Sequence, residues 1–157
     1  MKEAKSLKGV SAFHNLFDLP VIDEPAIPSK ERSLLRINLL EEELKELKEA
    51  IEANDLVEVA DAFCDIQYVL SGAILEFGMG KKFRKLFKEV QRSNMSKACQ
   101  DLQEAEDTLN HYRELKDTEG YIKPKEDKYL VYRKSDHKVL KSIKYSPARI
   151  AEILKAK

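Results

Sequence analysis

Carboxylate side chains recur at helical spacing in two neighbouring stretches of the chain, residues 42–46 and 58–65. The first has the pattern E-E-x-x-E, and the second has the pattern E-x-x-D followed by a further acid, Asp65. Residues three apart on an α-helix lie about 60° from each other, so the acids of each stretch share a face. If the two faces turn towards each other, four or more carboxylates meet in a small volume. Such a group repels itself unless a cation is bound.

Oxygen ligands without an accompanying cluster of His or Cys favour Mg²⁺ or Mn²⁺ over zinc. A cation with open water positions would engage the phosphates of a nucleotide. The alternative interpretation is a solvated helix face, and the pair Glu41–Lys45 at i,i+4 spacing fits it. The second stretch argues against this alternative. Asp61 and Asp65 interrupt an apolar segment, residues 57–70, which we expect to be a largely buried helix.

Two long helices must position these acids, with a polar turn at Asn54 and Asp55 between them. We expect Ser29 to cap the first helix, and Asp55 to cap the second, which runs to about Glu76 with Gly78 just beyond its end. A short loop makes such helices antiparallel neighbours. The spacing therefore predicts a helical hairpin that carries the acids.

Shorter elements are expected on either side of the hairpin. A helix over 4–17 and a proline-rich extended linker over 19–29 precede it, and a third helix over 81–91 follows it. The rest predicts a small α+β appendage. Its elements are a polar helix over 101–116 that Gly120 ends, β-like segments at 121–123, 129–133 and 139–143, and a last helix that Ser146 caps and that runs to about Ala156.

The acid pattern resembles that of the MazG-like, all-α nucleoside triphosphate pyrophosphohydrolases. This superfamily includes dimeric dUTPases and phosphoribosyl-ATP pyrophosphohydrolases. Three further segments are similar to one branch of it. They are the S-N-M-S-K sequence at 93–97, the segment 138–145, and the lead-in with Phe13, His14, Phe17 and Pro20. His137 stands where that branch usually has glycine.

The resemblance implies a metal-binding set, a catalytic pair and a set of substrate contacts. The metal ligands would be Glu43, Glu46, Glu58 and Asp61, with Asp65 supporting them. The catalytic residues would be Glu42 and Glu46, Glu42 either preparing the attacking water or binding a second ion. The substrate contacts would be Asn94, Lys97, Lys141 and Tyr145. The metal would be Mg²⁺, with Mn²⁺ as the alternative.

The expected fold is mainly α, a MazG-like antiparallel helical bundle completed by dimerisation, with a small C-terminal α+β appendage. We expect one domain over 1–157, with a helical core at about 30–98 and the appendage at about 100–157. The resemblance implies a homodimer or a dimer of dimers. It also implies metal-dependent hydrolysis of a nucleoside triphosphate, deoxy or modified, to the monophosphate and pyrophosphate. The alternatives are phosphoribosyl-ATP pyrophosphohydrolase and a non-catalytic helical interaction module.

Composition limits the remaining classes. The 28 basic and 28 acidic residues cancel, so the whole chain has no net field that would favour nucleic acid or an anionic membrane. No apolar run approaches the roughly 20 residues that span a bilayer, and charges interrupt the first twenty residues. Two cysteines make no disulfide framework, and Cys64 is expected in the core. We therefore expect a cytoplasmic protein with neither nucleic-acid nor membrane partners.

Overall fold

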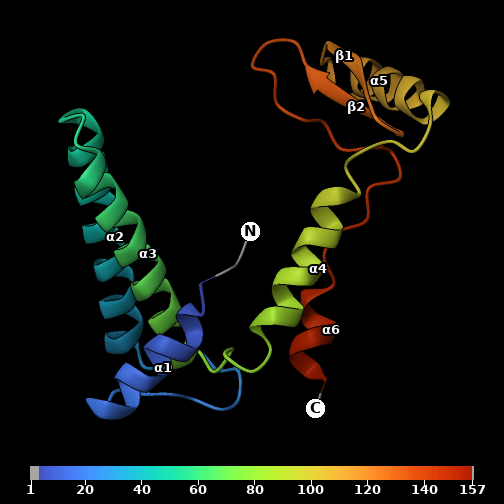
Figure 1. Ribbon diagram of the computed structural model, residues 1–157. Coiled ribbons are helices and arrows are strands. Elements are labelled where there is room, and N and C mark those ends of the chain that lie inside the picture. The colour runs from blue at the N-terminus through green and yellow to red at the C-terminus, as the bar shows by residue number, and fades with distance from the viewer. Residues whose placement is uncertain (1–3, 157) are drawn as a thin grey trace. The chain divides into compact units, whose positions relative to one another are not determined.

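The computed structural model describes residues 4–156, which form six helices and one two-stranded sheet (Figure 1). The mainly α fold predicted from the sequence is confirmed. The chain divides into two compact units, one ending at Phe83 and the other beginning at Arg84. Within the described residues, no helix has both the length and the apolar character that crossing a membrane requires.

Three helices make the first unit. They are α1 (Ser6–Leu16), α2 (Lys30–Glu52) and α3 (Leu56–Glu76). The helices α2 and α3 form the predicted antiparallel hairpin, and α1 packs against α3 (Figure 1). The buried apolar residues of this unit are Val10, Ala50, Ala62, Ile74 and Leu75. The three helices therefore share one small core.

Local sequence signals set the ends of the hairpin helices as predicted. The Ser29 hydroxyl accepts a backbone N–H in the first turn of α2, at 3.3 Å. The Asp55 carboxylate accepts the N–H groups of Val57 and Glu58, at 2.9 and 3.2 Å, and so caps α3. Gly78 follows α3 with φ of +68°, the left-handed conformation that closes a helix.

The first half of α3 is exposed in the single chain, and the expectation of a largely buried helix is wrong there. Phe63 is 57% exposed, and Cys64 is exposed rather than a core residue. Continuous burial begins only at Ser71, in the half of the helix that α1 accompanies. The apolar content of α3 therefore does not by itself put Asp61 and Asp65 in a core.

The second unit combines helices with a hairpin. Its elements are α4 (Phe83–Met95, starting at the boundary), α5 (Leu102–Lys116), β1 (Gly120–Lys125), β2 (Lys128–Arg133) and α6 (Ile150–Lys155). The strands β1 and β2 are antiparallel, and Ile122 pairs with Val131. Cys99, Ala105, Val131 and Leu140 form the buried core. Burial raises the pKa of the Cys99 thiol, which is fully enclosed.

The helix α5 ends at Lys116, as predicted, but Gly120 is not the residue that ends it. Asp117 adopts the left-handed conformation with φ of +45°, and the N–H of Thr118 donates to the Tyr112 carbonyl at 3.0 Å. A left-handed residue of this kind closes a helix without glycine, and Asp tolerates it better than most residues do. Gly120, which was expected to end the helix, instead begins β1.

The third strand predicted at 139–143 is wrong. Val139 makes a single bridge to Tyr132, and Leu140 donates its N–H to the Val131 carbonyl at 2.8 Å. Beyond this point the chain leaves the sheet, because the buried Ser142 hydroxyl donates to Glu104 of α5. Contacts with α5 replace a ladder of backbone hydrogen bonds.

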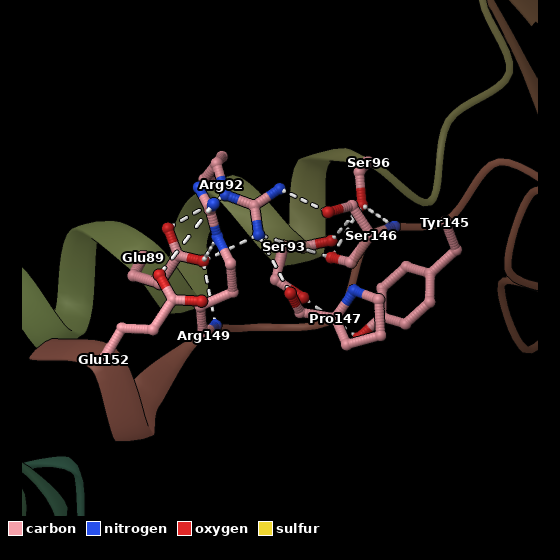
Figure 2. A network of polar contacts seen from close by, with 9 residues as sticks. All are labelled: Glu89, Arg92, Ser93, Ser96, Tyr145, Ser146, Pro147, Arg149 and Glu152. Carbon is pink, nitrogen blue, oxygen red and sulfur yellow. Dashed lines mark hydrogen bonds and ion pairs between the residues drawn. The ribbon is translucent and has the colours of Figure 1, made fainter.

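The last helix was predicted to begin at Pro147, directly after the expected cap Ser146. It begins three residues later, at Ile150. Figure 2 shows why the intervening backbone is not helical. The Pro147 carbonyl accepts a hydrogen bond from Arg92 of α4 at 3.0 Å, and the Arg149 N–H donates to Glu89 at 2.9 Å. These contacts hold the segment against α4, and Arg149, with φ of −91° and ψ of 56°, lies outside the helical region.

Glu89 is the centre of this contact between α4 and the segment before α6. Its carboxylate accepts from Nε and Nη2 of Arg92 at 2.9 and 2.7 Å, and from the backbone of Arg149. These hydrogen bonds, that from Arg92 above all, lower the pKa of Glu89 to about 2. The contact should therefore depend on pH in the acid range.

We expect acid to remove the stability that Glu89 provides. Its pKa of about 2 in the folded protein lies below the ordinary 4.5. The contribution is therefore complete above about pH 4.5 and is lost as the pH falls towards 2. Thermal unfolding of the wild type and Glu89→Gln across this range measures it. The difference in Tm should be constant above about pH 5 and should shrink below it. A difference that stays constant down to about pH 2 would contradict the assignment.

Candidate functional site

The carboxylates of α2 and α3 gather around Glu43. Burial raises the pKa of Glu43, and the negative charges of Asp65, Glu46, Glu42 and Asp61 raise it further, in that order. Neighbouring charges act in this way only at short range, so these five acids share one region of the hairpin. We call them the acidic cluster. The antiparallel pairing of α2 and α3 places its two halves on neighbouring helices.

One buried oxygen of the acidic cluster has no hydrogen-bond partner among residues 4–156. Glu43 Oε2 is buried and accepts no hydrogen bond. A buried carboxylate oxygen left unpaired is costly, and here the negative charges of four other acids add to the cost. A hard divalent cation would satisfy it, and carboxylate oxygens are the donors that Mg²⁺ prefers. The donor set therefore fits such an ion.

The predicted convergence of Glu43, Glu46, Glu58 and Asp61 on one point is not found in the described part of the chain. Within residues 4–156, no three His, Cys, Asp or Glu side chains converge as the ligands of a metal ion do. Glu43 and Asp65 are half-buried, whereas Glu42, Glu46 and Asp61 are exposed. The exposed side chains can change rotamer without disturbing a core. The hairpin thus supplies donors close together, in an open arrangement.

Two predicted residues differ in how they relate to Glu43. Glu58 is exposed in the first turn of α3, and it is not among the acids that raise the pKa of Glu43. Asp65, by contrast, is the strongest of the neighbouring charges. The sequence predicted only a supporting role for Asp65. Its position makes it as strong a candidate for direct ligation as Asp61.

The four predicted substrate contacts fall in one part of the second unit. Lys97 donates from Nζ to the Asn94 side-chain oxygen at 2.8 Å, and Lys141 Nζ lies 4.4 Å from the centre of the Tyr145 ring. The two pairs are linked through Ser93, whose hydroxyl is 2.9 Å from the Tyr145 hydroxyl (Figure 2). We call Asn94, Lys97, Lys141 and Tyr145 the lysine corner. Segments about fifty residues apart thus meet, and they present two ammonium groups.

A buried ion cluster in the first unit was not predicted. Glu76 is 1% exposed and accepts hydrogen bonds from Arg32 and from Arg36, the latter at 2.5 Å. Burial alone would raise the pKa of Glu76, but the two guanidinium groups hold it below its ordinary value. His14 is also buried, with Nε2 3.3 Å from Arg36 and Nδ1 2.9 Å from the Pro20 carbonyl. This cluster fastens α1 to the hairpin.

Gly72 makes room for the ion cluster. A Cβ atom there would lie 2.8 Å from Arg36 Nη1 and 3.0 Å from His14 Nε2, which is too close. A larger residue at this position would therefore displace the side chains of the cluster. The sequence does contain a signal for the cluster. Arg36 lies between the apolar residues Leu35 and Ile37, and Glu76 follows the apolar run 72–75. A charged residue in such a context is rarely buried unless it is paired.

A family model described as phosphoribosyl-ATP pyrophosphohydrolase matches residues 10–94, more than half of the chain. The chain belongs to this family. The MazG-like superfamily indicated by the acid pattern is thereby confirmed. The chain is also similar to uncharacterized protein L479 of Acanthamoeba polyphaga mimivirus, with 32% identity over 81 residues. That alignment covers 48% of this chain and 32% of the viral protein, so the chain spans about a third of that relative.

The part that matches the phosphoribosyl-ATP pyrophosphohydrolase family covers the whole helical hairpin. It contains the acidic cluster and the ion cluster, and it reaches Asn94 near the end of α4. The other members of the lysine corner lie beyond it. Membership of the family therefore supports the choice of the acidic cluster as the candidate site. The assignment of Lys97 depends on the S-N-M-S-K resemblance, and that of Lys141 and Tyr145 depends on the resemblance of segment 138–145 and on their proximity to Lys97.

Proposed function

We propose that this protein is a metal-dependent hydrolase that cleaves a nucleoside triphosphate between its α- and β-phosphates. The products are the nucleoside monophosphate and pyrophosphate. The observation that carries the proposal is the unpartnered Glu43 oxygen among four other carboxylates, in a chain of the phosphoribosyl-ATP pyrophosphohydrolase family. A deoxynucleotide or a modified nucleotide is the proposed substrate.

Each acid has a proposed task. Glu43, Glu46, Asp61 and Asp65 would hold Mg²⁺ or Mn²⁺, and Glu58 is a further candidate ligand. The ion supplies charge neutralisation and polarises a phosphoryl oxygen when it is bound. Glu42 or Glu46 accepts a proton from the attacking water, because both are exposed carboxylates within the cluster. The water oxygen bonds to the α-phosphorus, and the bond from that phosphorus to the bridging oxygen breaks.

The lysine corner is the proposed contact for phosphate oxygens. An ammonium group pairs with phosphate as a point charge. The lysine corner presents two ammonium groups, together with the amide of Asn94 and the phenol of Tyr145. Lys97→Met and Lys141→Met should raise KM more than they lower kcat. This part of the proposal does not depend on the acidic cluster. It can be wrong while the proposal for the acids holds.

We further propose that the protein acts as a homodimer or a dimer of dimers. The hairpin of one chain leaves large apolar side chains exposed. They include Leu44, Ile51, Leu56, Val57 and Phe63, with exposed fractions of 56–80%. Large apolar side chains left exposed on one helical hairpin are surface that a second subunit could cover. Light scattering coupled to gel filtration measures the mass, and a monomer at micromolar concentration would contradict the proposal.

A second candidate substrate is phosphoribosyl-ATP, because the matching family carries that name. It contains the same bond between α- and β-phosphates, so the same acids would serve. A non-catalytic interaction module is the remaining alternative. The open arrangement of the acidic cluster is the observation that favours it.

The test is pyrophosphate release from a panel of standard and modified NTPs and dNTPs, with phosphoribosyl-ATP included. Reactions contain Mg²⁺, Mn²⁺ or a chelator, and Glu46→Gln serves as the control. We expect metal-dependent release from one group of substrates, absent in the control. Release from phosphoribosyl-ATP alone would select the second candidate. No release from any substrate by a folded, oligomeric protein would leave the non-catalytic module.

A further inference from the structure

Three aromatic side chains gather on the first unit beside the acidic cluster. Phe13 of α1 contacts Phe17, with ring centres 4.4 Å apart, and Tyr68 of α3, with ring centres 5.7 Å apart and ring planes at 80°. We call Phe13, Phe17 and Tyr68 the aromatic platform. Their exposed fractions are 39%, 58% and 41%, so all three rings offer surface to a ligand.

The aromatic platform continues the face of α3 that carries the acids. Tyr68 follows Asp65 by three residues and Asp61 by seven, and these spacings place all three on one stripe of the helix. The rise along the helix from Asp65 to Tyr68 is about 4.5 Å. Acidic and aromatic groups thus follow one another along one stripe of a single element.

The buried side of α1 fixes the position of Phe13. His14, its neighbour, is held by the Pro20 carbonyl and by Arg36, and Val10 one turn earlier is 1% exposed. The ion cluster in turn ties Arg36 to Glu76 of α3. Phe13 therefore meets Tyr68 without any rearrangement, and a ligand that stacks there does not have to order the site first.

We propose that the aromatic platform stacks the base of the nucleotide whose phosphates are cleaved at the acidic cluster. The proposal rests on the function proposed above. A nucleotide carries a flat aromatic base and a charged phosphate chain on either side of its sugar. The first unit offers aromatic rings and a cation-binding set of acids in that same succession. Stacking tolerates every base, because each has a π-face, so the platform provides affinity and other contacts select the base.

Kinetics on the best NTP or dNTP test the platform first. Phe13→Leu keeps an apolar side chain of similar size but removes the ring, and Tyr68→Leu does the same on α3. We expect each to raise KM about tenfold or more with kcat changed less than about twofold, since stacking on an aromatic ring strengthens binding by roughly this factor. Tyr68→Phe retains the ring and should behave as wild type. Phe87→Leu is the matched control, an exposed ring on α4 of the second unit that belongs to none of the proposed sites.

A binding measurement separates this inference from the proposed function. The probe is the 2-aminopurine deoxynucleoside monophosphate, whose fluorescence falls when its base stacks. Without metal, the wild type and Glu46→Gln should quench it, and Phe13→Leu should not. Quenching without any hydrolysis would refute the function and keep the platform. Hydrolysis with an unchanged KM in Phe13→Leu would refute the platform alone. If Phe13→Leu and Tyr68→Leu lower the oligomeric mass but still quench the probe, the platform is a subunit contact and the inference is wrong.

Discussion

Replacing Glu43 by Gln is expected to abolish pyrophosphate release and, at the same time, to stabilise the metal-free protein. The carboxylate is partly desolvated, four like charges surround it, and one of its oxygens is unpaired. Removing its charge relieves repulsion in the empty site, so Tm should rise. The same change removes a central ligand. Activity should fall more than a hundredfold, because even residues that only orient metal ligands are worth 10–100-fold.

Thermal unfolding in chelator and pyrophosphate release in Mg²⁺ measure the two effects on one preparation. Added Mg²⁺ should raise the Tm of the wild type and should raise that of Glu43→Gln less. Glu49→Gln is the control on the same helix, since Glu49 is exposed and only pairs with Lys45 at 3.6 Å. A Glu43→Gln variant that is less stable in chelator, or that keeps its activity, would show that Glu43 is an ordinary surface acid.

Glu76→Gln is expected to destabilise the first unit by about 3–5 kcal/mol. The reason is the buried charge that remains. Arg36 is 7% exposed, and its Nε already lacks a partner, so a neutral amide would leave its guanidinium without a compensating carboxylate. Arg32, which also pairs with Glu76, would lose the same partner. Denaturant unfolding followed by circular dichroism gives the change in the free energy of unfolding.

Glu52→Gln is the matched control for this second variant. Glu52 also pairs with a cation, Lys48 at 3.7 Å, but both groups are exposed. Surface pairs of this kind contribute about 0–1 kcal/mol. If Glu76→Gln cost no more than Glu52→Gln, the ion cluster would not hold α1 to the hairpin. The aromatic platform would then lack its support.

The predictions that held depend on short-range chemistry. Ser29 and Asp55 cap helices because an oxygen side chain sits just before a helical stretch, and Gly78 follows α3 because glycine adopts positive φ freely. Helical spacing and a short turn also bring Glu43 near Asp61 and Asp65, but the predicted convergence of the acids on one point is not found in residues 4–156. None of these features needs a distant partner.

The predictions that failed depend on contacts remote in the sequence. Pro147 does not begin a helix because Arg92, fifty-five residues earlier, holds its carbonyl. Val139 does not start a full strand because Ser142 is drawn to Glu104. The ion cluster was missed for the same reason, because it depends on a contact between residues far apart in the sequence. Arg36 and Glu76 are forty residues apart. The apolar content of the first half of α3 predicted burial, but composition does not say what covers an apolar helix. In the single chain this half is exposed.

The contrast between the two cysteines gives the protein a built-in reporter. Thiolates, not thiols, react with maleimides, and the enclosed Cys99 with its raised pKa will stay protonated and unreachable. Cys64 is exposed and directly precedes Asp65, so a single dye can be attached beside the acidic cluster without mutating the chain. The chain has no tryptophan, so no tryptophan fluorescence would overlap with that of the dye. The labelling rate at increasing protein concentration then reads out directly whether a second subunit closes over this face of α3.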